Sequence, residues 1–334
     1  MASRPPRTSG VHIDKRGNSM AEPAAPGFPP SVFIIGAQKA GTTFLAARLD
    51  AHPAFSLAQP KEPDYFTRHF ARGADWYRTC FPILEGDGPL AILVDASTSY
   101  TMYGPEVGPA GTDPARRLQA ANPAARVIYM VRHPVARAYS AYLHARRYGG
   151  ESRPFDACLQ PESGYVMGSR YAFQLDHYRR VFPADQISLV IAEALWTQPE
   201  SVLNDILRVL GITPAPTTPT SSESSPNPGQ EKALNAAVVF NPVGTILTRL
   251  LGSAGLKRIN TGAKALLPAP LHAALKRAIT RAPPSITTAQ HHRLRDLLAA
   301  DTHRFACETG IVYDLSTEAA PPHMKIGRAV IPLA

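Results

Sequence analysis

A glycine-rich loop near the N-terminus carries the residues best suited to bind an anion. Gly36 and Gly41 have the spacing of the phosphate-binding pattern G-x-x-x-x-G-K-[ST], and Thr43 holds its Ser/Thr position. Thr42 stands where that pattern requires a lysine, and the nearest lysine is Lys39, inside the loop. Backbone N–H groups of such a turn bind a phosphate, but the missing lysine argues against transfer of a γ-phosphoryl group. The loop therefore predicts a cradle for one phosphate, with Lys39 beside it.

A second pair of polar residues predicts another anion site. Arg132 directly follows an apolar run that ends at Val131, and Ser140 comes eight residues after Arg132. Open α/β sheets bind ligands at the carboxyl ends of their strands, which is where Arg132 would lie. Eight residues are about two helical turns, so Ser140 would lie on the face of the following helix that looks toward Arg132. Both side chains could then face one anion.

The segments around these residues alternate between strand and helix patterns. Apolar runs typical of buried parallel strands occur at 32–35, 90–95, 126–131 and 187–191. Helix patterns occur at 42–51, 135–147 and 199–210, and amphipathic helical stretches at 232–252, 264–280 and 287–308. We therefore expect an α/β fold that is P-loop-like and three-layered, with a central parallel sheet flanked by helices and a helical C-terminal third.

The composition divides the chain into one domain with extensions. Residues 1–30 are rich in Pro, Arg, Ser and Gly, and we expect a disordered extension in which Met20 is an alternative start. A single domain is expected over 31–315, interrupted by a flexible insertion at 213–230 that is rich in Pro, Ser and Thr. Residues 316–334 are expected to form a C-terminal tail.

The net charge and the cysteine content indicate which binding partners and which cellular compartment to expect. A formal net charge of +9 favours an anionic ligand or a polyanionic surface. The sequence contains no known nucleic-acid-binding module, so nucleic acid is not an expected partner. The three cysteines lack metal-ligand spacing, and no run of 18 apolar residues occurs. We expect free thiols, no membrane span, no metal and a cytoplasmic location. The oligomeric state is left open.

The order of these blocks resembles the sulfotransferases that use 3′-phosphoadenosine 5′-phosphosulfate (PAPS). It is most similar to the branch of bacterial and heparan-sulfate-type enzymes, over about residues 31–211 with a weaker echo at 287–315. Its blocks are QKAGTT at 38–43, KEPDYF at 61–66, DWY at 75–77, VDASTSY at 94–100, GSRY at 168–171 and FPADQI at 182–187. The resemblance implies transfer of a sulfuryl group to a hydroxyl or amine of a carbohydrate, or of a glycosylated or secondary metabolite.

The resemblance also implies roles for individual residues. The residues that would bind PAPS are Gln38, Lys39, Ala40, Gly41, Thr42, Thr43, Arg132, Ser140 and Tyr171, with Arg132 and Ser140 on its 3′-phosphate. Lys39 would stabilise the oxygen that leaves between phosphate and sulfate, and Glu62 would be the base that removes the acceptor's proton. Asp64 and His69 are the alternatives for the base. Because a sulfuryl group carries less charge than a phosphoryl group, no metal is required.

Departures from the family pattern and rival functions stay open. The family branch often has a lysine where this chain has Ala96. The basic residue that closes over the nucleotide is not identified, and its candidates are Lys257, Arg258 and Arg281. One rival function is a P-loop kinase or NTPase, because the apolar run ending at Asp95 imitates a strand with a magnesium-binding aspartate. The other is a non-catalytic relative that binds a nucleotide or polyanion.

Overall fold

The computed structural model describes residues 28–82, 91–104, 112–148, 150–214, 234–235, 280–281, 284–316 and 329–333. The predictions of a disordered N-terminal extension and of a flexible insertion therefore concern residues that lie almost entirely outside the described ranges.

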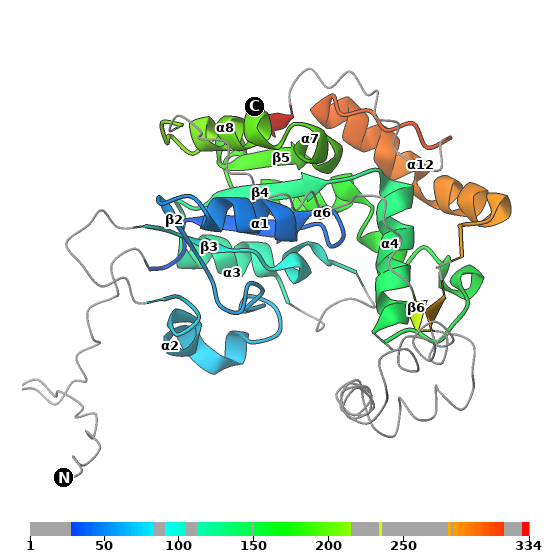
Figure 1. Ribbon diagram of the computed structural model, residues 1–334, viewed down its shortest axis with the longest axis horizontal. Coiled ribbons are helices and arrows are strands. Elements are labelled where there is room, and N and C mark those ends of the chain that lie inside the picture. Colours follow the sequence, from blue (N-terminus) through cyan, green and yellow to red (C-terminus); the bar gives the residue numbers. More distant parts are fainter. Residues whose placement is uncertain are drawn as a thin grey trace, which may run out of the picture.

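A six-stranded sheet forms the centre of the molecule, with the strand order β2-β3-β1-β4-β5-β8 (Figure 1). Its strands are β1 (Val32–Gly36), β2 (Phe55–Leu57), β3 (Ile92–Asp95), β4 (Arg126–Val131), β5 (Ile187–Ile191) and β8 (Val330–Pro332). All neighbouring strands run parallel except β8, which pairs antiparallel with β5. Because β1 lies between β3 and β4, the chain order reverses beside it. Such a switch point is where open α/β sheets bind ligands.

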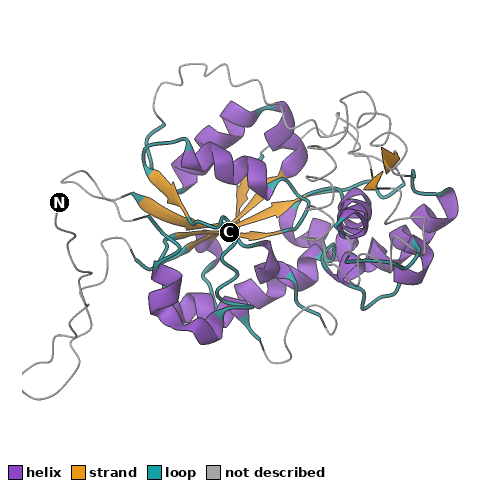
Figure 2. Cartoon of the chain, turned by 60° about the horizontal axis from the view of Figure 1, so that its bottom comes forward, coloured by secondary structure: helices purple, strands orange, loops and turns teal. Residues whose placement is uncertain are grey.

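Helices cover both faces of this sheet (Figure 2). The helices are α1 (Thr42–Asp50), α2 (Gly73–Arg78), α3 (Pro114–Ala121), α4 (Pro134–Arg147), α5 (Gly164–Met167), α6 (Tyr171–Arg179), α7 (Ala192–Thr197), α8 (Pro199–Val209) and α12 (Thr288–Thr309). The 3₁₀ turns are η1 (Phe70–Arg72), η2 (Thr98–Thr101), η3 (Phe155–Cys158) and η4 (Ala184–Gln186). Within the described ranges, no helix is both long and apolar enough to span a membrane.

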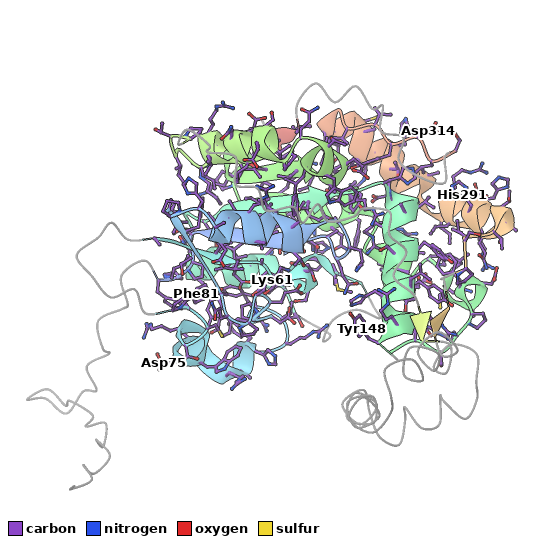
Figure 3. All side chains as sticks on the ribbon, viewed as in Figure 1. Lys61, Asp75, Phe81, Tyr148, His291 and Asp314 are labelled. Atoms are coloured by element: carbon purple, nitrogen blue, oxygen red, sulfur yellow. The ribbon has the colours of Figure 1, made fainter. Side chains whose placement is uncertain are left out.

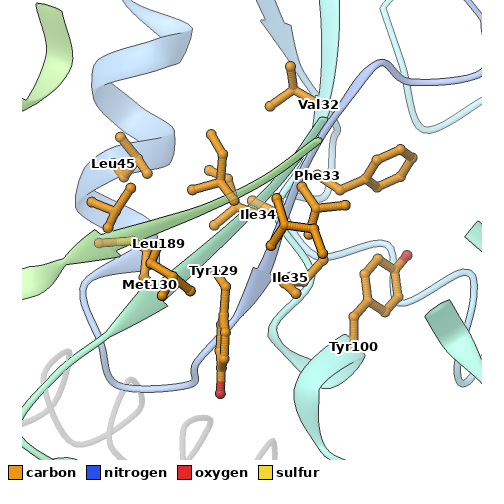
Figure 4. Packing of buried hydrophobic residues seen from close by; sticks show 14 of the residues in the cluster. Val32, Phe33, Ile34, Ile35, Leu45, Tyr100, Tyr129, Met130 and Leu189 are labelled. Carbon is orange, nitrogen blue, oxygen red and sulfur yellow. The ribbon is translucent and has the colours of Figure 1, made fainter. Parts of the chain in front are cut away.

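The apolar runs of the sequence become buried strands because helices pack on both sides of them. All five residues of β1 and all five of β5 are buried. Around Ile34, the side chains of Leu45, Met130 and Leu189 join α1, β4 and β5 in one hydrophobic cluster (Figure 4). This packing fixes α1 against β1 and so holds the ends of the loop that joins them.

The structure confirms the α/β fold and most of the predicted elements. The strands predicted at 126–131 and 187–191 have those bounds, and the last predicted helix is α12. Thr287 begins that helix with a capping box, since its side chain accepts a hydrogen bond from Gln290 N while the Gln290 side chain accepts one from Thr287 N.

Two strands differ from the prediction, and two predicted helices lie almost wholly outside the described residues. The short strand β2 at the sheet edge was not predicted. Strand β8 lies in the segment expected to be a tail, and its antiparallel pairing makes the sheet mixed rather than wholly parallel. The stretches predicted as helices at 232–252 and 264–280 lie almost entirely outside the described residues; of the described ones, Leu234–Asn235 form β6, and β7 (Thr280–Arg281), which pairs with it, begins at the last residue of the second stretch. The pairings of β2 and β8 both join segments that are distant in sequence, which local patterns do not encode.

Candidate active site

The loop between β1 and α1 turns on two glycines whose backbone disfavours any side chain. Gly36 has φ 142°, and a Cβ there would lie 2.0 Å from Thr101 Oγ1. Gly41 has φ 87°, and a Cβ there would lie 3.1 Å from Trp196 Nε1. Both φ values lie in the region that glycine adopts at little cost. The spacing of the two glycines thus reflects a tight loop whose backbone can approach a ligand closely.

This loop leaves the N-terminal end of α1 open to an anion. No described side chain caps that end, and the first turn of α1 carries no acidic residue. The N–H groups of an uncapped first turn and the positive end of the helix dipole favour a phosphate. Thr42 is buried, Thr43 is exposed, and the side chain of Ala40 is fully buried. Ala40 can therefore contribute only its backbone to a ligand.

Arg137 of α4 supports the loop between β1 and α1 through a hydrogen bond to its backbone. No sequence pattern predicted a role for this residue. Its side chain is 2% exposed, and burial lowers its pKa. Its guanidinium donates to Gln38 O at 3.3 Å, to Ser169 Oγ at 2.6 Å and to Tyr165 O. A buried arginine with three acceptors is a fixed support, so Arg137 positions the loop rather than binding a ligand. Its place in the first turn of α4 was visible in the sequence, but its burial was not.

Arg132 lies at the C-terminal end of β4, as predicted, and it touches the loop. Its Nη1 donates to Lys39 O at 3.1 Å, and its guanidinium lies 5.0 Å from the centre of the Trp196 ring. Burial lowers the pKa of Arg132, and the nearby Glu193 carboxylate opposes that shift. Trp196, which no sequence pattern indicated, therefore joins Arg132 to the Gly41 side of the loop.

Tyr171 and Ser140 have different relations to Arg132. The buried Tyr171 hydroxyl donates to Arg132 O at 2.7 Å and accepts from Arg132 N at 3.2 Å. These contacts support a role for Tyr171 in orienting Arg132. Ser140 lies half-buried on α4, and within the described ranges no hydrogen bond joins it to Arg132. Their joint binding of one phosphate stays a prediction.

Lys39 faces a histidine of α4. Its backbone has φ 70°, and its Nζ lies 3.5 Å from His144 Nδ1. Burial lowers the pKa of His144, and the positive charges of Lys39 and Arg147 lower it further, while Glu62 opposes them. The His144 ring also packs on Tyr148 at 4.6 Å, and Figure 3 shows Tyr148 beside α4. Lys39 therefore extends from the phosphate loop to the C-terminal end of α4, where no sequence pattern predicted a site residue.

Glu62, the candidate base, forms a compact cluster with Lys61. Lys61 Nζ donates to Glu62 Oε1 at 2.8 Å, while Glu62 Oε2 accepts from Thr98 Oγ1 at 2.8 Å. Burial raises the pKa of Glu62, but the Lys61 ammonium and the Thr98 hydrogen bonds outweigh it, so the pKa lies below its usual value. Lys61 also donates to Thr42 Oγ1 at 3.4 Å, which links the cluster to the start of α1. Figure 3 shows Lys61 near that helix. At neutral pH the Glu62 carboxylate is thus ionised.

The two alternative bases have other partners. Asp64 Oδ1 accepts from Ser99 Oγ at 2.6 Å, and Asp64 N donates to Ser97 Oγ at 3.0 Å. These bonds make Asp64 part of the turn that joins this loop to η2. The His69 ring packs edge-on against Trp76, with centroids 5.2 Å apart. Within the described ranges, neither residue has a hydrogen bond to Lys61, which joins Glu62 to Thr42 at the end of the phosphate loop, so Glu62 remains the better candidate.

Asp95, the residue that suggested a kinase, is enclosed by hydroxyl groups. Its side chain is 0% exposed and accepts from Ser97 Oγ at 2.6 Å, Tyr77 OH at 2.6 Å and Tyr100 OH at 2.7 Å. Burial raises the pKa of Asp95 to about 6, although the three hydrogen bonds oppose that rise. A carboxylate engaged in this way is a poor magnesium ligand, since a metal would have to displace the hydroxyls.

The other sequence-predicted features are partly described. Lys257 and Arg258 lie outside the described residues, and Arg281 lies in β7 with its side chain not described. In the described part of the chain, no three His, Cys, Asp or Glu side chains gather closely enough to hold a metal ion. All three cysteines are free thiols. The residue that closes over the nucleotide therefore stays unassigned.

Comparison with known proteins shows where this chain belongs. Residues 30–216 match the profile described as "Sulfotransferase family". The bifunctional heparan sulfate N-deacetylase/N-sulfotransferase 2 of Homo sapiens is 28% identical over 205 residues, covering 55% of this chain and 22% of that protein. The heparan sulfate glucosamine 3-O-sulfotransferase 6 of Homo sapiens is 30% identical over 214 residues, covering 58% of this chain and 59% of that protein. The matched region thus spans from about a fifth to three-fifths of these relatives.

A solved structure has the same fold. The crystal structure of a sulfotransferase from Alicyclobacillus acidocaldarius superposes with a TM-score of 0.52 and 22% identity, covering 86% of this chain and 98% of that one. The family match includes the glycine loop, Glu62, Arg132 and Tyr171. On this basis, the chain belongs to the sulfotransferase family.

Proposed function

We propose that this protein transfers the sulfuryl group of PAPS to a hydroxyl or amine of a saccharide-type acceptor. The observation that carries the proposal is the hydrogen bond from Arg132 to the backbone of Lys39, which joins the two predicted anion elements in one site. PAPS has two separate anionic parts, a 5′-phosphosulfate and a 3′-phosphate. The uncapped start of α1 suits the first part, and the strand-end arginine suits the second.

Each residue of the site has its own role in the proposed sulfuryl transfer. The acceptor atom attacks sulfur, and its proton passes to the Glu62 carboxylate. The bond between sulfur and the bridging oxygen breaks, and its electron pair stays on the phosphate of 3′-phosphoadenosine 5′-phosphate (PAP). In such a loose, in-line transfer, charge grows on the leaving oxygen, which the Lys39 ammonium would stabilise. Tyr171 holds the backbone of Arg132 while Arg132 and Ser140 bind the 3′-phosphate.

The names of the relatives support a saccharide acceptor. Two of the proteins matched at about 30% identity are named for heparan sulfate. The matched region of this chain covers only part of each, so their substrates come to this protein as a proposal. A net charge of +9 agrees with an acidic saccharide, because it attracts polyanions.

Calorimetric titration of PAP, AMP and ATP tests the donor assignment. PAP should bind at least tenfold more tightly than AMP, because the 3′-phosphate gains charge-assisted hydrogen bonds of about 1.5–3 kcal/mol. Equal affinities would refute the 3′-phosphate site at Arg132 and Ser140. Mass spectrometry of acidic and neutral oligosaccharides incubated with labelled PAPS then tests the acceptor class. PAP binding without transfer to any acceptor would favour the non-catalytic relative.

The kinase alternative loses its main support in the structure. A P-loop kinase needs an aspartate that is free to hold Mg²⁺ and a lysine that reaches the terminal phosphates. Asp95 is engaged by three hydroxyls, and Thr42 stands in the position of that lysine. ATP-dependent labelling of an acceptor would reverse this preference.

A further inference from the structure

Lys61 connects the phosphate loop with the candidate base. Its ammonium donates to Glu62 Oε1 at 2.8 Å, to Ala96 O at 3.2 Å and to Thr42 Oγ1 at 3.4 Å. These acceptors come from the loop after β2, from the end of β3 and from the first residue of α1. A lysine ammonium has three N–H donors, so these three acceptors account for all of its donors. With 21% of its side chain exposed, Lys61 is held at the edge of the site rather than in solvent.

Lys61 contacts one residue proposed to act on the sulfuryl donor and one proposed to act on the acceptor. Thr42 belongs to the loop that would hold the phosphate of the donor, and Glu62 would receive the proton of the acceptor. In an in-line transfer, the attacking atom, the sulfur and the leaving oxygen lie roughly on one line. The sulfuryl group must therefore move between the loop and the carboxylate. A cation hydrogen-bonded to both ends lies alongside that path.

We propose that Lys61 is a further catalytic residue, whose ammonium contacts the non-bridging oxygens of the sulfuryl group during its transfer. This inference rests on the proposed function. When the donor binds, the ammonium turns from Glu62 and Thr42 toward the sulfuryl oxygens. The carboxylate it releases then takes the acceptor's proton as the new bond to sulfur forms and the bond to the bridging oxygen breaks. Lys39 acts on the leaving oxygen and Lys61 on the group that moves.

The proposed role of Lys61 can be tested by comparing how tightly the protein binds PAPS and PAP. PAPS carries the sulfuryl group and PAP does not, so a residue that contacts only the sulfuryl group distinguishes the two ligands. A residue of the phosphate cradle affects both ligands alike. The comparison needs no acceptor, and so it is independent of the acceptor's identity.

Calorimetry and single-turnover transfer with Lys61→Met test the proposal. We expect the affinity for PAP to be unchanged and the affinity for PAPS to fall roughly tenfold or more, the value of one charge-assisted hydrogen bond. Turnover should fall roughly 10²–10³-fold, as for loss of one group that stabilises developing charge. Lys61→Arg, which keeps the charge, should recover part of the turnover. Arg208→Met removes one positive charge from an exposed pair with Asp205 on α8 and should change neither affinity nor turnover.

A measurement on the wild-type protein keeps the test valid if Lys61→Met does not fold. Acetylation of Lys61 by an N-hydroxysuccinimide ester, followed by mass spectrometry, should be slowed by PAPS and much less by PAP. Equal protection by the two nucleotides, equal losses of PAP and PAPS affinity, or normal turnover of Lys61→Met would each overturn the role of Lys61. If the wild-type protein binds neither nucleotide, it is the proposed function that fails.

Discussion

Glu62→Gln removes the charge of the proposed base but keeps its size and its hydrogen bond from Thr98. Turnover should fall roughly 10²–10⁴-fold, the usual range for a lost general base. Nucleotide affinity should hardly change, because no hydrogen bond joins Glu62 to residues 37–41 of the loop within the described ranges. The substitution thus separates proton removal from donor binding.

The structure predicts that this variant stays folded. The ion pair that it breaks, between Lys61 and Glu62 at 2.8 Å, has side chains that are 21% and 39% exposed. Pairs with this exposure contribute less than about 1 kcal/mol to the free energy of unfolding. The melting temperature should therefore fall by a few degrees at most, on the order of the 2–4 °C that 1 kcal/mol causes in a domain of this size.

The pH dependence of sulfate transfer should also differ between the wild type and Glu62→Gln. The Lys61 ammonium and the Thr98 hydrogen bonds outweigh the effect of burial and hold the pKa of Glu62 below 4.5. Only the ionised carboxylate can accept a proton, so wild-type kcat/KM, which reports the free enzyme in which Lys61 pairs with Glu62, should be level at neutral pH and should fall as the pH decreases through that lowered pKa. Glu62→Gln should lose this acidic limb.

The assay is single-turnover transfer of labelled sulfate at saturating acceptor, with PAP affinity measured in parallel. Glu200→Gln is the matched control, because Glu200 pairs with Arg48 at 2.7 Å on a different surface and should keep full turnover. Near-normal turnover of Glu62→Gln would refute the assignment of the base. Asp64→Asn would then be the next variant, despite the hydrogen bonds that hold Asp64 in its turn.

Three further predictions test the loop, the chemistry and the core. Lys39→Ala should weaken PAP binding and also lower turnover, as measured by calorimetry and sulfate transfer, because Lys39 would touch both phosphate and leaving oxygen. Excess EDTA should change sulfate transfer by no more than a factor of a few, an indirect effect; abolition with rescue by Mg²⁺ would favour the kinase. The contribution of Asp95 to the free energy of unfolding should fall by about 3 kcal/mol as the pH rises from below 4 to above 6, since burial raises the pKa of Asp95 from 3.8 to about 6 and the folded state binds that proton more tightly. Chemical denaturation of the wild type and of Asp95→Asn across this pH range should show this change as the difference between the two pH profiles.

Local sequence determined the elements and the chemistry that they can carry. The apolar run at 32–35, the two glycines and the following helix are neighbours in the chain, so their pattern predicts a strand, a phosphate loop and a helix in that order. The position of Arg132 at the end of β4 follows in the same way from the apolar run before it. Resemblance of the ordered blocks then indicated the family, which the match over residues 30–216 confirms.

The tertiary structure decided which of several similar residues meet at the site. Arg132 and Arg137 differ in their role because Arg137 is enclosed by carbonyl and hydroxyl acceptors, while Arg132 donates to Lys39 O and lies over the Trp196 ring. No sequence pattern predicted a role for Lys61 itself, because two of its acceptors come from the end of β3 and the start of α1. Strand β8 joins the sheet from the far end of the chain. Each of these contacts joins segments that are distant in sequence, and their formation depends on packing of the whole domain rather than on any local pattern.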